Sequence, residues 1–228
     1  TQAGIDNILA FDMGGTTAKL ALVDNGEPHV AYHFEAAREK RFAEGSGLPL
    51  NISAIELIEI GAGGGSIAHI DAMELLKVGP ESAGSEPGPV CYGRGGQNPT
   101  VTDADLLLGY LNAGSFAGGS MQIDADAAAR AMQPLADRSG LSVIDTARGI
   151  YEVVNENMAS AARVHIAERG KDPRQYTLLA TGGAGPVHAY YVARKLGVRR
   201  MICPPAAGVA SALGLLIAPA PTRRTAPR

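Results

Sequence analysis

The segment Asp12-Met13-Gly14-Gly15-Thr16-Thr17-Ala18-Lys19 lies between two apolar runs, Ile8 to Asp12 and Ala18 to Val23. The two runs predict a β-hairpin with a glycine turn between its strands. Two adjacent glycines allow backbone amides to face a phosphate, and the threonine hydroxyls add further donors. A carboxylate at the end of a strand can hold Mg²⁺ or its waters. The segment therefore predicts a phosphate-binding turn, with a plain glycine hairpin as the alternative.

A second glycine segment, Thr181-Gly182-Gly183-Ala184-Gly185-Pro186, follows a predicted strand at Tyr176 to Ala180 and opens a helix that extends to about Leu196. Proline is common in the first turn of a helix, and a helix N-terminus favours negative charge. A strand at Arg199 to Cys203 then completes a βαβ unit. Two glycine loops that each follow a strand predict the two sides of a nucleotide cleft, one for phosphates and one for adenosine. Neither loop has the spacing of a Walker A or a GxGxxG motif.

The remaining chain predicts a mixed α/β domain rather than a repeat protein. A helix is expected after Thr102, whose hydroxyl and Asp105 three residues later have the spacing of a helix cap. The other expected elements are strands at Ile52 to Ile60 and Ser66 to Ile70, an irregular loop at Val78 to Pro99, and helices at Asp124 to Ala136, Ser142 to Arg169 and Gly208 to Ile217. The tail at 219–228, rich in proline and arginine, is expected to be disordered.

The composition excludes several classes of protein. The 228 residues include 20 basic and 23 acidic side chains, so the net charge of −3 argues against a nucleic-acid binder. Cys91 and Cys203 form no CxxC pair, which argues against a disulfide scaffold and a cysteine zinc site. The sequence shows no apolar run of about 18 residues and no signal peptide at its start, so neither a membrane span nor export is expected. These features favour the cytoplasm.

Six segments together resemble the hydantoinase A/5-oxoprolinase family, which includes N-methylhydantoinase A-like proteins. The resemblance extends over about residues 8 to 217, and its most specific part is the string VGPESAG…PGP…TVTDAD. The six segments are Asp12 to Lys19, Ile60 to Asp71, Val78 to Gly96, Pro99 to Leu111, Glu156 to Arg169 and Thr181 to Ala189.

The resemblance implies the actin-like ATPase fold of sugar kinases and Hsp70 chaperones, with a mixed sheet flanked by helices. It implies ATP-dependent opening of cyclic amides of the hydantoin or 5-oxoproline type. In close relatives, the acetone and acetophenone carboxylases, the implied reaction is ATP-dependent carboxylation of a ketone. The implied cofactors are ATP and Mg²⁺, and the implied partner is a hydantoinase B-like subunit, while self-association into a homo-oligomer is left open.

The resemblance matches Asp12 to Thr17 to a phosphate loop and Gly182 to Gly185 to an adenosine loop, and the residues themselves add Asp103 and Lys19 as candidates. Asp12 is the expected Mg²⁺ ligand and a catalytic residue, and Asp103 is the second catalytic candidate, as a metal or substrate ligand. Asp105 is expected only to cap its helix. The expected phosphate-binding residues are Gly14, Gly15, Thr16, Thr17 and Lys19, and the expected adenosine-binding residues are Gly182, Gly183, Ala184 and Gly185.

Full-length members of the family are longer and carry an additional phosphate loop, so residues 1–218 are expected to form a partial ATPase domain. The alternative function is that of a non-catalytic fragment that binds nucleotide or assists assembly. Four further side chains keep open roles: His69 and Asp71 can face the cleft, His165 is expected to be a core or rim histidine, and His188 meets either a phosphate or a loop carbonyl. Cys91 is expected to be buried packing.

Overall fold

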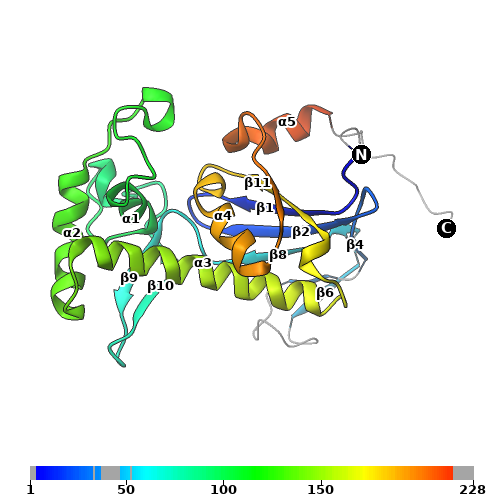
Figure 1. Ribbon diagram of the computed structural model, residues 1–228, viewed down its shortest axis with the longest axis horizontal. Helices are drawn as coiled ribbons and strands as arrows, with labels where there is room; N and C mark the ends of the chain where they lie inside the picture. Colours follow the sequence, from blue (N-terminus) through cyan, green and yellow to red (C-terminus); the bar gives the residue numbers. More distant parts are fainter. Residues whose placement is uncertain (1–3, 33, 37–46, 52, 218–228) are drawn as a thin grey trace.

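The computed structural model describes residues 4–32, 34–36, 47–51 and 53–217. Its main sheet has the order β12-β11-β1-β2-β3, and β8 also pairs with β2 (Figure 1). β1 pairs in parallel with β11 and antiparallel with β2, so the sheet is mixed. Its strands are β1 (Ile8–Met13), β2 (Ala18–Asp24), β3 (Glu27–Pro28), β8 (Leu57–Ile60), β11 (Thr177–Thr181) and β12 (Arg200–Ile202).

Five α-helices and several short elements surround this sheet in the described part of the chain. The helices are α1 (Val101–Leu107), α2 (Ala125–Ser139), α3 (Val143–Ala167), α4 (Gly185–Leu196) and α5 (Ala210–Ile217). Short 3₁₀ turns lie at Val90–Tyr92, Phe116–Gly119, Pro173–Gln175 and Ala207–Val209. Three strand pairs lie outside the main sheet: β4 (Val30–Ala31) with β7 (Ala54–Ile55), β5 (Phe34–Ala36) with β6 (Leu48–Leu50), and β9 (Ser66–Ile70) with β10 (Leu76–Ser82).

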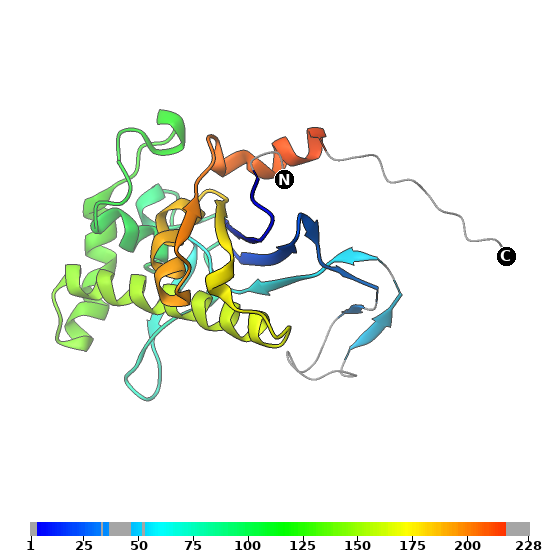
Figure 2. The ribbon, with the colours of Figure 1, turned by 45° about the vertical axis from the view of Figure 1, so that its right-hand side comes forward.

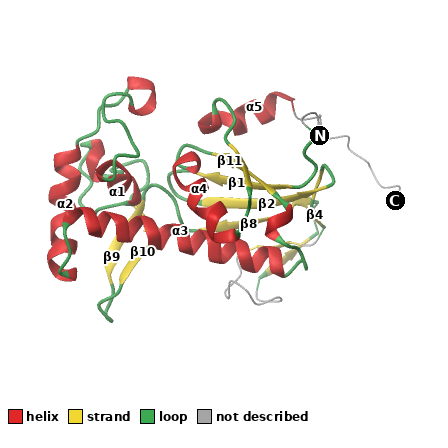
Figure 3. Cartoon of the chain, in the orientation of Figure 1, coloured by secondary structure: helices red, strands yellow, loops and turns green. Residues whose placement is uncertain are grey.

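The core lies between the sheet and helices α3 and α4. Alternate strand residues point to this side, because successive side chains of a strand face opposite ways. Leu9, Phe11 and Leu178 are fully buried there. The 25-residue α3 extends past the sheet to α1 and α2. These two helices pack together beyond one end of the sheet (Figure 3). A second view shows the same arrangement (Figure 2). One long helix therefore connects the sheet to the region of α1 and α2.

Most of the expected elements are present, with two corrections. The expected irregular loop at Val78 to Pro99 begins with a strand, because residues 78–82 belong to β10. The expected cap of Thr102 and Asp105 is shifted by two residues, because Thr100 is the N-cap of α1 and Asp103 completes its capping box. Asp124 and Ser142 are the N-caps of α2 and α3, so both helices start where the sequence predicts. The tail at 219–228 lies outside the described residues.

Among the helices that the structure describes, none combines the length and the apolar character needed to cross a membrane.

Candidate functional site

The two glycine loops lie at one edge of the sheet. β1 and β11 are parallel neighbours, and Asp12 is the register partner of Thr181. Their carboxyl ends therefore meet at the same edge, where the turn at 14–17 follows β1 and the loop at 182–185 follows β11 (Figure 1). Sites of open α/β sheets form at the carboxyl ends of their strands. The structure brings together the two segments that the sequence predicts to form one cleft.

The turn after β1 presents free backbone donors. Gly14 donates its N–H to the carbonyl of Thr17 at 3.0 Å, which closes the turn. Within the described chain, the backbone N–H groups of Gly15, Thr16 and Thr17 have no hydrogen-bond partner. Gly15 and Thr16 are exposed. Successive unpaired N–H groups in a turn form a concavity that binds anions.

A third glycine loop, which follows β8, supports this turn. Gly64 donates its N–H to the carbonyl of Gly14 at 3.0 Å, and Gly65 donates to the carbonyl of Gly15 at 2.6 Å. A Cβ at Gly63 would fall 2.5 Å from the carbonyl carbon of Thr16, so the two backbones touch. The sequence predicts no such role for this cluster. Its one signal is the run of glycines, which close backbone contact requires.

Two further segments hold the third loop in place. Thr102 donates both its N–H, at 2.7 Å, and its hydroxyl, at 2.8 Å, to the carbonyl of Gly64. Ala83 donates its N–H to the carbonyl of Gly65 at 2.8 Å. The start of α1 and the segment after β10 therefore fix the turn through the third loop.

The loop after β11 is joined to the end of β1. Ala184 donates its N–H to the carbonyl of Met13 at 2.9 Å, and Gly182 donates to the carbonyl of Ala207 at 3.0 Å. Gly185 is buried, whereas Gly183 is exposed and has open space where a Cβ would stand. Of the four predicted adenosine-binding residues, Gly183 is therefore the most accessible to a ligand.

Asp12 lies at the junction of the two loops. Its Oδ2 accepts a hydrogen bond from the Thr181 hydroxyl at 2.7 Å. Its Oδ1 has no partner among the described residues, so one oxygen remains available. Lys19 is its cross-strand neighbour and is exposed, and no ion pair joins the two side chains.

The Asp12 carboxylate can bind Mg²⁺ only together with ligands that are not protein side chains. No group of three or more His, Cys, Asp or Glu side chains that could hold a metal occurs in the part of the chain that the structure describes. Mg²⁺ is usually bound by one or two carboxylates together with waters and substrate phosphates. Asp12 with a phosphate held in the turn at 14–17 matches that mode. The described residues around Asp12 do not form a metal site built from protein side chains alone.

Asp103 has a structural position that argues against the expected catalytic role. It is fully buried. Its carboxylate accepts the N–H groups of Cys91 at 2.7 Å, Thr100 at 2.8 Å and Val90 at 3.2 Å, and the Thr100 hydroxyl at 2.8 Å. Both oxygens are occupied by local donors. In this geometry Asp103 joins α1 to the segment at 90–91 and presents no oxygen to a ligand.

His188 meets neither a phosphate nor a loop carbonyl. It is fully buried in α4, where its Nε2 lies 3.2 Å from Oδ2 of Asp105 and its Nδ1 lies 3.1 Å from Oδ1 of Asn155. Tyr151 stacks on the ring, with 4.9 Å between ring centroids. Asp105 therefore does not cap α1. Its side chain joins α1 to α4 through His188.

The remaining side chains that the sequence singles out lie away from the two glycine loops or inside the core. Asp71 accepts the N–H groups of Met73 and Leu75 and so closes the turn between β9 and β10. His69 is the register partner of Lys77 on the same hairpin. His165 is buried, and burial lowers its pKa. Cys91 is buried as expected, and burial raises the pKa of its thiol, which makes it a poor nucleophile.

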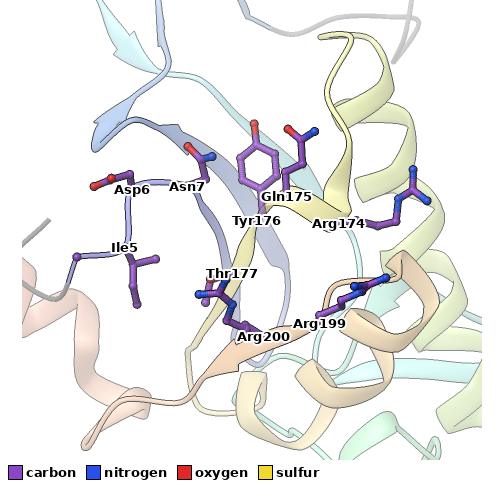
Figure 4. A pocket seen from close by; sticks show the side chains of 10 residues that line it. Ile5, Asp6, Asn7, Arg174, Gln175, Tyr176, Thr177, Arg199 and Arg200 are labelled. Carbon is purple, nitrogen blue, oxygen red and sulfur yellow. The ribbon is translucent and has the colours of Figure 1, made fainter.

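A cavity of about 410 Å³ opens at the opposite edge of the sheet. Its wall includes Asn7, Thr177 and Arg200, at the starts of β1, β11 and β12 (Figure 4). The glycine loops follow the other ends of these parallel strands. This cavity is therefore separate from the candidate site.

Comparison with known proteins extends these observations. A family model described as hydantoinase/oxoprolinase matches residues 1–224. An uncharacterized protein of Methanocaldococcus jannaschii is 44% identical over 216 residues, which cover 93% of this chain and 32% of that protein. Caprolactamase subunit alpha of Pseudomonas jessenii is 41% identical over 215 residues, which cover 94% of this chain and 30% of the subunit.

Two solved structures share the architecture. The nucleotide-free structure of acetone carboxylase superposes with a TM-score of 0.82 at 33% identity and covers 93% of this chain and 29% of that chain. The crystal structure of the ATP-dependent caprolactamase from Pseudomonas jessenii gives a TM-score of 0.80 at 40% identity, with 93% and 30% covered. The mixed sheet flanked by helices is thus confirmed. The chain spans about a third of the length of the curated relatives that it matches.

Proposed function

The chain belongs to the hydantoinase/oxoprolinase family, and we propose that it forms a nucleotide-binding part of an ATP-dependent enzyme that opens cyclic amides. The proposed role of this part is to hold Mg·ATP between the turn at 14–17 and the loop at 182–185. An actin-like ATPase architecture, a cytoplasmic location and a partner subunit of the hydantoinase B type belong to the same proposal.

One observation carries the proposal. Among the described residues, the N–H groups of Gly15, Thr16 and Thr17 have no hydrogen-bond partner, and neither has one oxygen of the neighbouring Asp12 carboxylate. Backbone donors of this kind bind phosphate, and the carboxylate supplies the complementary position for Mg²⁺. The adjoining loop offers the open Gly183, where a flat nucleoside can approach the backbone.

The residues of the chain have separate tasks in this arrangement. ATP, when bound, supplies the phosphoryl group that turns a poor carbonyl electrophile into a reactive one. The turn at 14–17 neutralises phosphate charge with fixed N–H dipoles, which need no reorganisation during the reaction. Asp12 orients Mg²⁺ or its waters, and Lys19 adds positive charge at the same edge of the sheet. The loop at 182–185 fixes the nucleoside end.

A cyclic amide is the first substrate class because the family description names oxoprolinase and the Pseudomonas relative is a caprolactamase. Ketone carboxylation is the second, favoured by the similarity to acetone carboxylase. The designation of the Pseudomonas relative as a subunit supports the proposal of a partner chain. A chain that binds nucleotide without turning it over is the outcome that would favour the non-catalytic alternative.

The first experiment is calorimetric titration of the chain with Mg·ATP, repeated with Asp12→Asn. Saturable binding that weakens about tenfold in the variant supports the proposal, because a tenfold change corresponds to loss of one charged contact. Asp137→Asn is the matched control, since Asp137 is exposed on α2 and its side chain accepts a hydrogen bond from Gln133, far from the glycine loops in the sequence. Absence of binding by the folded chain would contradict the proposal.

Hydrolysis assays then separate the substrate classes. The chain and a co-purified partner subunit are supplied with Mg·ATP and either 5-oxoproline, hydantoin or caprolactam, or with acetone and bicarbonate. ADP or AMP release that depends on a cyclic amide supports the first class. Release that depends on ketone and bicarbonate supports the second.

A further inference from the structure

The ends of β1 and β11, which lead into the two glycine loops, are joined by the side chain of Thr181. The Thr181 hydroxyl lies 2.7 Å from Oδ2 of Asp12 and 3.4 Å from the carbonyl oxygen of Phe11. A hydroxyl has one proton, and the shorter contact to a charged oxygen is the stronger one. The hydroxyl of Thr181 therefore donates to Asp12.

The sheet itself brings this pair together. Thr181 is the register partner of Asp12 on the neighbouring parallel strand, although 169 residues separate them in the chain. Thr181 is also the residue before Gly182, where the loop after β11 begins. The donor of the bond thus comes from the nucleoside side of the cleft and the acceptor from the phosphate side.

The bond distinguishes the two oxygens of the Asp12 carboxylate. A carboxylate attached to a strand can rotate about its Cβ–Cγ bond, because this torsion has a broad energy profile. Donation to Oδ2 restricts that rotation. The other oxygen, Oδ1, has no partner among the residues the structure describes and remains available for a ligand.

We propose that Thr181 is a positioning residue for Mg·ATP, which turns Oδ1 of Asp12 toward the metal or a metal-bound water. This inference rests on the proposed nucleotide function. It adds that the last residue of β11, just before the nucleoside loop, sets how strongly Mg²⁺ contributes to binding at the phosphate turn. Thr181 itself contacts no ligand in this assignment, so its removal weakens the contribution of Mg²⁺ more than the binding of the nucleotide alone.

The test compares the affinity of the full chain for ATP in MgCl₂ with its affinity in EDTA, by calorimetry. The ratio of the two affinities isolates the metal contribution. In Thr181→Val, which keeps the β-branched shape and removes the donor, we expect this ratio to fall roughly tenfold, as for loss of one hydrogen bond to a charged group. Thr181→Ser restores the donor and should keep the ratio within about twofold of the parent.

Thr177→Val is the matched control. Thr177 lies on the same strand and the same face, at the end that borders the cavity of Figure 4. The same substitution there should leave the ratio unchanged. Thermal melts of all variants confirm that they fold, and Thr181→Ala replaces the valine variant if the latter is unfolded.

The outcomes are distinct. An unchanged ratio in Thr181→Val overturns the positioning role while the nucleotide function stands. A parent chain that binds ATP equally well in MgCl₂ and EDTA overturns it as well. A parent chain that binds no ATP overturns both the proposed function and this inference. A ratio that falls in the valine variant and recovers in the serine variant supports the assignment.

Discussion

Gly182 lies so close to Met13 that a Cβ added at Gly182 would fall 2.3 Å from the carbonyl oxygen of Met13. That carbonyl also accepts the N–H of Ala184 at 2.9 Å. The φ angle of Gly182 is +86°, a conformation that side chains rarely adopt. The contact between the two loops is thus made by backbone atoms, and position 182 has no room for a side chain.

Gly182→Ala should therefore destabilise the fold. The positive φ and the backbone overlap together predict a loss of about 2 kcal/mol or more in the free energy of unfolding. Urea denaturation measures it. Gly183→Ala is the control, because a Cβ there meets nothing within 4 Å, and its stability should stay within about 0.5 kcal/mol of the parent. Equal stability of the two variants would contradict the predicted clash.

Gly63→Ala should displace the phosphate turn. A Cβ at Gly63 would lie 2.5 Å from the carbonyl carbon of Thr16, so one of the two backbones must move. We expect Mg·ATP affinity to fall at least about tenfold, because the N–H groups of the turn lose their alignment. Calorimetric titration measures this effect. Gly61→Ala should bind normally, since its nearest contact is Cβ of Pro80 at 3.6 Å.

Asp24 should make stability depend on acid pH. Burial alone would raise its pKa, but hydrogen bonds from Lys171, Tyr176 and His29 outweigh burial and lower the pKa to about 2. Because the folded pKa is below the usual value of 3.8, the carboxylate stabilises the fold above about pH 4. This contribution, about 2 kcal/mol, is lost as the pH falls from about 4 toward 2.

The measurement for Asp24 is the urea midpoint from pH 2 to pH 5. Asp24→Asn should lower stability at pH 5 and flatten the decline between pH 4 and pH 2, because the variant has no carboxylate to protonate. Asp137→Asn, on the exposed side of α2, should reproduce the parent curve. Parallel curves for the parent and Asp24→Asn would refute the assignment.

Asp105→Ala should be strongly destabilising. The side chains of Asp105 and His188 are 3% and 0% exposed, and 3.2 Å separates Oδ2 from Nε2. Removing one member of such a pair leaves the other buried and unpaired, which costs about 3 kcal/mol. Chemical denaturation tests this value, with Asp137→Ala as the exposed control. A cost below about 1 kcal/mol would mean that water replaces the lost carboxylate.

Local signals predicted much of the fold. The glycine turn, the βαβ unit and the starts of α2 and α3 depend on residues a few positions apart, and the structure contains all of them. The first helix shows the limit of such signals. Thr100 with Asp103 and Thr102 with Asp105 have the same spacing, so the sequence alone does not choose between the two capping pairs.

Long-range contacts decided what the sequence left open. Asp105 pairs with His188 across 83 residues, which is why it is no cap. The support of the phosphate turn by Gly64 and Gly65 spans about 50 residues and is made by backbone atoms, so the run of glycines does not indicate which segment it contacts. Thr181 had a detectable signal, because it and Asp12 both lie within two residues of a glycine loop at the ends of strands of the same sheet.

The pairing of β1 with β11 has a consequence for biosynthesis. β1 leaves the ribosome well before its parallel neighbour, which is completed only at Thr181. Until then the nascent hairpin of β1 and β2 exposes one strand edge with Leu9 and Phe11 beside it. Such edges promote aggregation in incomplete chains. The nascent hairpin should therefore depend on chaperones until β11 has been translated.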